Sequence, residues 1–201
     1  MTSAPVPSRR ALLLASAGAL AVPRVRAQAG RPLRLIVPFT PGGSTDILAR
    51  AIAPKLGAAL GQTVIVDNRP GAGGSLGAAE AAKAEPDGQT ILMGHIGTLA
   101  VNPALYPKLA YDPMKSFVPV AWVARVPNVL VVPAAWPARS FADFVERVRA
   151  QPGRYSYSSG GNGSAAHITL EFLKLRARLF MLHIPYRGTA PSVSDLIAGQ
   201  V

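Results

Sequence analysis

Short apolar runs alternate with helix-like patterns along most of the sequence. Residues 33–37 form a compact apolar run that ends at Pro38, which predicts a buried strand. Apolar residues then return at helical spacing over residues 46–60. Strands and helices in this alternation are typical of an open, parallel α/β sheet. The predicted strands cover residues 33–37, 63–66, 90–93, 117–124, 129–132, 155–158 and 179–184, and the predicted helices cover 46–60, 76–84, 141–150, 165–175 and 190–198.

Prolines interrupt this pattern at several points. Pro54 falls inside the first helical pattern and should kink or split that helix, because proline lacks the N–H that the next turn needs. Residues 102–116 have the composition of irregular chain. Pro119 and Pro127 favour sheet edges, ends or bulges for the strands around them. We expect those strands to carry the chain from one lobe to the next.

The turn between the first strand and the first helix has the chemistry of an anion site. Gly42 and Gly43 can adopt positive φ or let a ligand approach the backbone closely. Ser44 is the expected N-cap, and Asp46 lies in the first turn, where a carboxylate suits the helix dipole. The unpaired N–H groups at such a helix start bind anions well. A single strand-to-helix turn of this kind, called an elbow below, is common in α/β proteins.

A second elbow of the same kind follows the strand at 155–158. Residues 158–164, SSGGNGS, lead directly into the helix at 165–175. Two elbows rich in Gly and Ser, one in each of two α/β lobes, would supply backbone N–H and hydroxyl donors to an anion held between them. We expect the lobes to cover residues 30–124 and 125–201 and to close around a hinge.

Two enzyme-like readings compete with binding. The loop 71–77 is G-x-G-x-x-x-G rather than the dinucleotide fingerprint, and no acidic residue ends the next strand. Ser164 and His167 could share a helix face in a hydrolase, but no G-x-S-x-G elbow surrounds the serine. His167 is expected to orient a loop or cap its own helix, and His183 to be a satisfied core histidine. The three His are far apart in sequence, so we expect no metal site and no cofactor.

Composition and charge agree with a folded binding protein. The 201 residues are 49% hydrophobic and only 15% charged, and cysteine is absent, which excludes disulfides and thiol catalysis. The formal net charge of +11 partly comes from four arginines before residue 27. The other basic residues are scattered and not interleaved with aromatics, so we predict a solvated basic surface and no nucleic-acid partner.

The first 29 residues have the pattern of an export signal. A charged start at Arg9 and Arg10 precedes an apolar stretch from residue 11 to 22, and Ala27-Gln28-Ala29 fits a cleavage site. The paired arginines resemble a twin-arginine signal, although Sec export accounts for the same residues about as well. We therefore predict a signal peptide over 1–29, cleavage near Ala29 and a periplasmic mature protein.

Five segments together resemble the Bug/TctC periplasmic solute-binding proteins of the tripartite tricarboxylate transporter class. In chain order they are IVPFTPGGSTDILAR (36–50), VIVDNRPGAGGSLGA (64–78), EPDGQTILMG (85–94), YSSGGNGSAAHITLEFL (157–173) and HIPYRGTAPSVSDLIAGQV (183–201). The resemblance implies a two-lobed, periplasmic-binding-protein-like Venus-flytrap fold. It also implies a monomer without enzymatic activity that captures a di- or tricarboxylate, an amino acid or an aromatic acid for a membrane permease.

The resemblance also implies which residues grip the ligand. One side of the site is the first elbow, the other is formed by loops of the second lobe, and Gly73 and residues 95–98 are expected at the rim. Asp46 is expected to anchor the elbow rather than to touch a carboxylate, which would repel it. The implied ligand-binding residues are Phe39, Gly42, Gly43, Ser44, Asp46, Ser158, Gly160, Gly163, Ser164, His167, Tyr186 and Thr189.

The chain departs from the family pattern in two places. Family members are longer, and we expect a C-terminally truncated copy in which the second lobe and the return to the first lobe are incomplete. Arg176 and Arg178 stand where the family has a glycine-containing turn. Exposed sheet edges would weaken such a chain, so a paralogue that no longer closes on a ligand is the third alternative, beside binding and hydrolysis.

Overall fold

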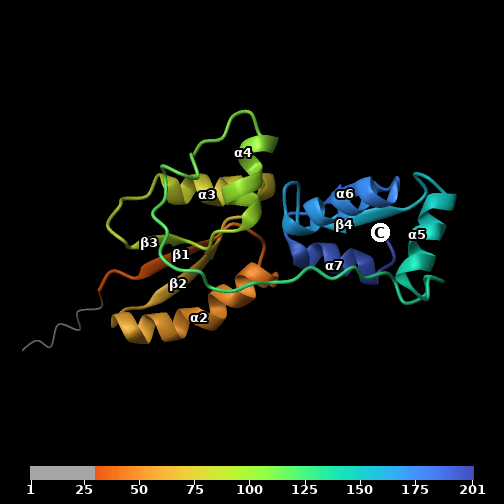
Figure 1. Ribbon diagram of the computed structural model, residues 1–201. Coiled ribbons are helices and arrows are strands. Elements are labelled where there is room, and N and C mark those ends of the chain that lie inside the picture. Colours follow the sequence, from red (N-terminus) through yellow and green to blue (C-terminus); the bar gives the residue numbers. More distant parts are fainter. Residues whose placement is uncertain (1–29) are drawn as a thin grey trace, which may run out of the picture.

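The computed structural model describes residues 30–201 and contains two α/β units that lie side by side (Figure 1). The signal-peptide prediction, residues 1–29, falls outside the described residues. An extended stretch of chain runs from the first unit to the second, and each unit has its own parallel sheet. The boundary at residue 124 lies within that stretch and stays a prediction.

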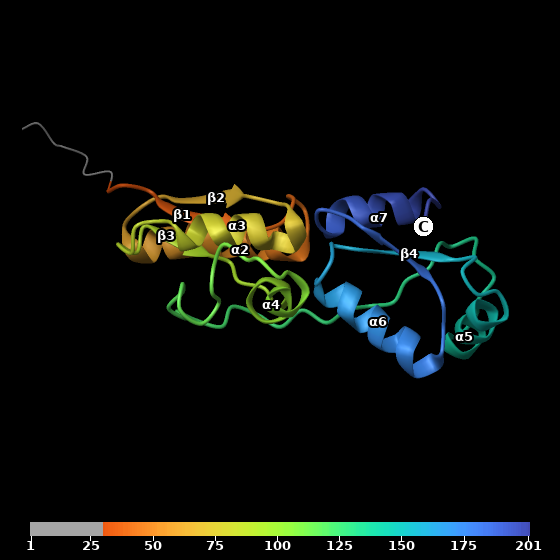
Figure 2. The same ribbon diagram turned by 90° about the horizontal axis from the view of Figure 1, so that it is seen from above.

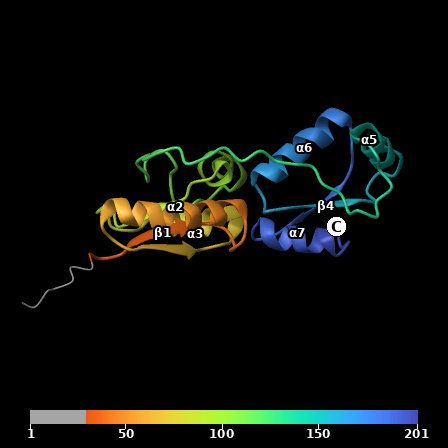
Figure 3. The ribbon, with the colours of Figure 1, turned by 90° about the horizontal axis from the view of Figure 1, so that it is seen from below.

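The first unit is a three-stranded parallel sheet between two helices. Its strand order is β2-β1-β3, so the apolar run predicted from the sequence is the central strand. The helices α2 and α3 lie on opposite sides of this sheet (Figures 1 and 3). The elements are β1 (Leu33–Val37), α2 (Ser44–Leu60), β2 (Val64–Asn68), η1 (Ala72–Gly74), α3 (Ser75–Ala82), β3 (Thr90–Leu92), η2 (Gly97–Val101) and α4 (Asn102–Leu105).

Burial on both faces of β1 explains why its sequence is a continuous apolar run. Leu35 and Val37 pack with Ala49 of α2 and with Met93 in the main core cluster of this unit. Ile36 points the other way and is also fully buried, because successive strand residues alternate between faces. A central parallel strand has no polar face.

The second unit is a pair of parallel strands with three helices. Strand β4 pairs with β5, and α6 and α7 lie on opposite sides of the pair (Figure 2). Phe144 and Val148 of α5 pack with Tyr157, Leu179 and Met181 to form its core. The elements are α5 (Phe141–Ala150), β4 (Ser156–Ser159), α6 (Ala165–Ala177), β5 (Leu182–Pro185) and α7 (Thr189–Ile197).

The strands predicted over 117–124 and 129–132 are wrong. Residues 117–132 are extended coil that passes from one unit to the other (Figure 1). Within residues 30–201 no strand pairs with this segment and no backbone hydrogen bond joins it to another segment. Val118 and Val120 are 87% and 86% exposed. Branched residues favour an extended backbone, but a strand also needs a partner for its N–H and C=O groups.

Three smaller expectations also need correction. Gly43, not Ser44, is the N-cap of α2, and no side chain caps this helix. The helix runs through Pro54 as one element, with Pro54 on its exposed side, where water can reach the carbonyl that lacks a partner. The segment 97–105, predicted as loop and irregular chain, is helical in η2 and α4. By contrast, α5 covers residues 141–150 as predicted, and Ser140 is its N-cap.

We expect Leu35→Ala to destabilise the protein by about 2–5 kcal/mol, because it leaves a cavity between β1 and α2. Leu35 is 1% exposed, whereas Ile65 on the neighbouring strand is 49% exposed. Ile65→Ala is therefore the matched control and should cost under about 1 kcal/mol. Urea unfolding followed by circular dichroism measures both, and equal losses would contradict the assignment of the core.

Candidate anion-binding site between the two units

Four helices begin at the seam where the two units meet. The strands of each sheet are parallel and each leads into a helix, so the carboxyl ends of the strands and the following helix starts share one edge. In both units this edge faces the other unit, and α2, α3, α6 and α7 start there (Figures 1 and 2). Unpaired N–H groups and the positive ends of the helix dipoles therefore gather at the seam.

The two units approach each other so closely that only glycine fits at the contact points. A Cβ atom on Gly188 would lie 2.1 Å from Thr40 Oγ1, and one on Gly73 would lie 2.4 Å from the Asn162 carbonyl oxygen. The Thr40 N–H also donates a hydrogen bond to the Arg187 carbonyl across the seam, at 3.3 Å. The positions of these glycines are therefore set by backbone approach between units rather than by turn geometry alone.

The starts of α2 and α7 face each other directly. A Cβ atom on Gly43 would lie 3.7 Å from the backbone N of Thr189, and one on Gly160 would lie 3.5 Å from the same nitrogen. Gly43 precedes α2, Thr189 opens α7, and Gly160 belongs to the loop before α6. The starts of α2 and α7 thus meet within a few ångströms, beside the loop that leads to α6, and like dipole ends at this distance repel unless an anion lies between them.

Asp46 anchors the first elbow from inside the first unit. Its carboxylate accepts hydrogen bonds from the Gly42 N–H at 2.9 Å, Asn68 Nδ2 at 2.9 Å and Arg50 Nε at 3.0 Å. Asn68 also donates to the Phe39 carbonyl at 3.0 Å. Burial by itself raises the pKa of Asp46, but the hydrogen bonds from Arg50, Gly42 and Asn68 outweigh it and hold the pKa below its usual value.

The second elbow is held by its own serine and histidine side chains. Ser164 Oγ caps α6 by accepting the His167 N–H at 3.3 Å, and the ring Nδ1 of His167 accepts the Gly163 N–H at 3.1 Å. The Ser192 hydroxyl donates to Ser158 Oγ at 2.8 Å, which ties the end of β4 to α7. The side chains of Ser164 and His167 are thus engaged with the backbone of the second elbow and stabilise its shape.

A cavity of about 180 Å³ lies at the seam. No acidic residue lines it, and Arg187 is the one charged residue that does. Among the described residues, two of the buried side-chain oxygens without a hydrogen-bond partner, Thr40 Oγ1 and Asn102 Oδ1, belong to residues at the seam. The lining comes from both units and consists of Phe39, Gly71, Ala72, Gly73, Gly74, Tyr106, Gly160, Gly161, Asn162, Pro185, Tyr186 and Arg187.

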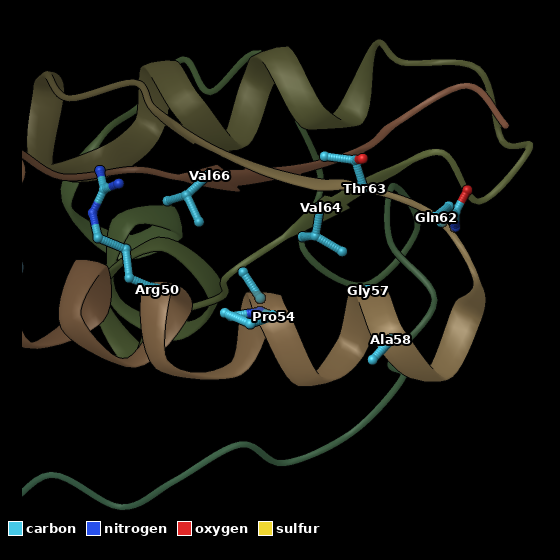
Figure 4. Close-up of a pocket in the computed structure, with 9 residues that line it drawn as sticks. Arg50, Pro54, Gly57, Ala58, Gln62, Thr63, Val64 and Val66 are labelled. Carbon is cyan, nitrogen blue, oxygen red and sulfur yellow. The ribbon is translucent and has the colours of Figure 1, made fainter. Parts of the chain in front are cut away.

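A larger hollow of about 560 Å³ lies elsewhere, on the first unit between α2 and the edge strand β2 (Figure 4). It is lined by the middle and end of α2 and by β2, and Arg50 is its one charged residue. Arg50 is already paired with Asp46. Because no helix start points into this hollow, it lacks the cluster of donors that the seam has.

Comparison with known proteins decides the family. The model of the tripartite tricarboxylate transporter family receptor, TctC, matches residues 48–201. The chain belongs to the TctC family. It is 42% identical over 198 residues to a UPF0065 protein from the tcbD–tcbE intergenic region of Pseudomonas sp. strain P51, an alignment that covers 96% of this chain and 59% of the relative. The chain thus spans about three fifths of that relative's length.

Solved TctC-like structures confirm the fold class. A protein described as a periplasmic transporter shares 44% identity and a TM-score of 0.83, over 87% of this chain and 59% of the other. R. palustris Rpa4515, solved with adipate, shares 40% identity and a TM-score of 0.83, over 86% and 57% of the two chains. MatC from Rhodopseudomonas palustris, solved with bound malate, shares 35% identity and a TM-score of 0.81, over 86% and 58%.

In this TctC-family chain, most of the residues predicted from the sequence lie at the seam. Phe39, Gly160 and Tyr186 line the cavity, and Gly43 and Thr189 face each other beside it. Gly42, Asp46, Ser158, Gly163, Ser164 and His167 shape or hold the two elbows. Ser44 occupies the first turn of α2, and its assignment to the ligand stays a prediction, as does that of the whole set.

Several residues at the seam were not predicted. Thr40 and Asn162 belong to the two predicted elbows but were not named as site residues, and Asn102, Tyr106 and Arg187 come from other segments. Asn102 donates to the Gly73 carbonyl at 3.0 Å and to Ser75 Oγ at 2.8 Å, which fixes the turn before α3. The one available signal was position, because Thr40 and Arg187 are neighbours of predicted elbow residues.

The hydrolase alternative finds no support in the geometry. The hydrogen bond between Ser164 and His167 uses the histidine's backbone N–H, while its ring Nδ1 is occupied by Gly163. A serine nucleophile needs a ring nitrogen to take its proton. Within residues 30–201 no group of His, Asp and Glu is placed to hold a metal ion, and no helix is long and apolar enough to cross a membrane.

We expect Asp46→Asn to destabilise the protein by about 2 kcal/mol at pH 7, because the charge-assisted hydrogen bonds to Asp46 are lost. Since the folded pKa of Asp46 lies below its usual value of 3.8, the stabilisation is present above that value and disappears as the pH falls through the folded pKa. Unfolding in urea from pH 7 to pH 2.5 should therefore show the two proteins converging in acid.

Glu85→Gln is the matched control for Asp46→Asn, since Glu85 is an exposed carboxylate of the same unit. It should change stability by less than about 0.5 kcal/mol. A constant difference between wild type and Asp46→Asn at all pH values would contradict the role given to the Asp46 charge.

Proposed function

We propose that this chain binds a small carboxylate between its two units and serves as an exported receptor of a tripartite tricarboxylate-type uptake system. The proposal depends on one observation above all, the meeting of helix starts from both units at a cavity without acidic residues. Backbone N–H groups bind a carboxylate well, and the helix dipoles favour its negative charge.

The ligands of related structures support a carboxylate with a second polar end. Rpa4515 was solved with adipate and MatC with malate, and each of these molecules carries two carboxylates. In this chain one carboxylate would lie near Gly43, Gly160 and Thr189, where the helix starts converge. Arg187 is positioned in the lining to meet the other one, because a guanidinium pairs well with carboxylate.

The proposed receptor is a monomer without enzymatic activity, and its partner is a membrane permease. The description of the matching family as a transporter receptor supports this, and the related periplasmic transporter supports export to the same compartment. The basic, acid-free start of the sequence, with its small-residue cleavage pattern, is the segment that would direct export.

We expect adipate or malate to raise the melting temperature, because a ligand that binds only the folded state stabilises it by about 2.7 kcal/mol at a hundredfold excess over Kd. The matched control is the corresponding diamide, which has the same length and no charge. It should give no shift, since the helix dipoles favour an anion. An equal shift with acid and amide would contradict carboxylate recognition, and no shift with any acid would favour a chain that no longer binds.

We expect Ser44→Ala to weaken binding of the stabilising acid about 10- to 150-fold, the loss of one hydrogen bond to a charged group. Ser44 lies in the first turn of α2 and is half-buried at the seam. Ser194→Ala, which removes an exposed hydroxyl further along α7, is the control and should leave affinity unchanged. Calorimetry measures both, and unchanged affinity for Ser44→Ala would remove this serine from the site.

A further inference from the structure

The loop before α6 is supported, within the second unit, by two stacked histidines. The rings of His167, on α6, and His183, on β5, lie 4.2 Å apart at 23° to each other. The ring of Tyr157, on β4, stacks on the other face of the group, 4.7 Å from His183. Both imidazoles reach the same short loop, residues 160–163, whose Gly160 and Gly161 line the cavity.

His167 contacts the loop through an unprotonated ring nitrogen. The Gly163 N–H donates to His167 Nδ1 at 3.1 Å, so Nδ1 must carry a lone pair and the proton of the neutral ring lies on Nε2. A second proton on Nδ1 would place two donors face to face. This hydrogen bond therefore exists only while His167 is neutral.

His183 contacts the loop through Ser159. His183 Nε2 and Ser159 Oγ are 2.7 Å apart, and Ser159 Oγ also accepts the Gly161 N–H at 3.1 Å. The same hydroxyl lies 3.2 Å from the Gly161 carbonyl oxygen. Ser159 is 2% exposed, so no water competes for these contacts. The hydroxyl has one proton, so it donates to the Gly161 carbonyl only when His183 Nε2–H donates to it, and this link does not require a neutral His183.

Among the charged groups around the pair, Glu171 favours a positive imidazole and Lys174 opposes it, and the effect of burial on the two histidine pKa values outweighs that of Glu171. On α6, Glu171 accepts from Lys174 Nζ at 2.7 Å and from the Tyr157 hydroxyl of β4, so its charge is already paired. On α7, Asp195 accepts from Tyr186 at 2.5 Å. Burial lowers the pKa of His167, and burial together with the neighbouring His167 lowers the pKa of His183 to about 4.

We propose that His167 is a positioning residue that holds the loop 160–163 in its binding shape only while its ring is neutral, with His183 as a second support through Ser159. This inference rests on the proposed carboxylate site, since the loop is one wall of it. Acid then disorders that wall and weakens the ligand. A histidine that paired directly with the carboxylate would do the opposite and bind it more tightly in acid.

The direction of the pH effect follows from the pKa. The folded pKa of His167 lies below its usual value of 6.5, so the neutral, loop-holding state is complete above 6.5 and is lost as the pH falls through the folded pKa. Affinity should drop in the same window. With one proton taken up, Kd rises by up to about tenfold per pH unit below that pKa.

The test uses two substitutions that keep the hydrogen bonds and remove the titration. In His167→Asn an amide oxygen replaces Nδ1 as acceptor, and in His183→Gln an amide replaces Nε2. Calorimetry with adipate and malate from pH 7.5 to pH 4.5 compares wild type with each single variant and the double variant. The protonation of the acids themselves affects all proteins equally, so only the difference between proteins reports on the histidines.

We expect wild type to lose more affinity between pH 7.5 and pH 4.5 than the double variant, each protein being compared with its own affinity at pH 7.5. Glu146→Gln, which removes an exposed carboxylate of α5 in the same unit, should follow the wild-type profile. An identical loss of affinity in wild type and His167→Asn, or tighter wild-type binding in acid, would overturn the proposal.

A measurement without ligand separates this inference from the proposed function. In ¹⁵N-correlation NMR spectra the amide signals of Gly161 and Gly163 should shift with a midpoint below pH 6.5 in wild type, and Gly163 should stop shifting in His167→Asn. If these shifts occur while neither acid binds at pH 7.5, the carboxylate proposal fails and the histidine support stands. If neither glycine shifts between pH 7.5 and pH 4.5, the histidine support is wrong, whatever binds.

Discussion

The repulsion between like ends of helix dipoles is the constraint on which the rest of this structure depends. Parallel strands joined by helices send all helix starts to one edge of each sheet, and the two units place these edges against each other. Asp46, in the first turn of α2, offsets part of this charge, but its carboxylate already accepts from Gly42, Asn68 and Arg50, and no acidic residue lines the cavity. This remaining positive character is what supports the proposed binding of an anion at the seam.

The sequence predicted those parts of the fold in which a local pattern and a packing role coincide. The central strand at 33–37 is apolar because both of its faces are buried, and α5 has both its Ser140 cap and its apolar spacing. Both elbows were also predictable as glycine-rich turns between a strand and a helix; one such turn is common in α/β proteins, and it was the pair that indicated a site. Their meeting at one seam follows from topology rather than from any residue.

The rest depended on partners that no local pattern reveals. Residues 117–132 have the composition of strands but no neighbouring strand to pair with in the described part of the chain. Thr40, Asn102 and Arg187 belong to the seam only because glycines elsewhere let two backbones approach. His183 was expected to be a satisfied core residue, and the structure shows what satisfies it, a buried serine that leads to the cavity wall.

The extended coil at 117–132 also has an energetic consequence for the seam. Without backbone hydrogen bonds to either unit, it holds the units together as a tether and leaves their contact to the loops that meet there. In the proposed function the second half of the site would approach the first as an intramolecular step, at the raised effective concentration that a covalent connection gives. Fewer hydrogen bonds to a small anion would then be needed to favour closed units over separated ones. The covalent chain has already removed most of the translational entropy that the association of two separate molecules would lose.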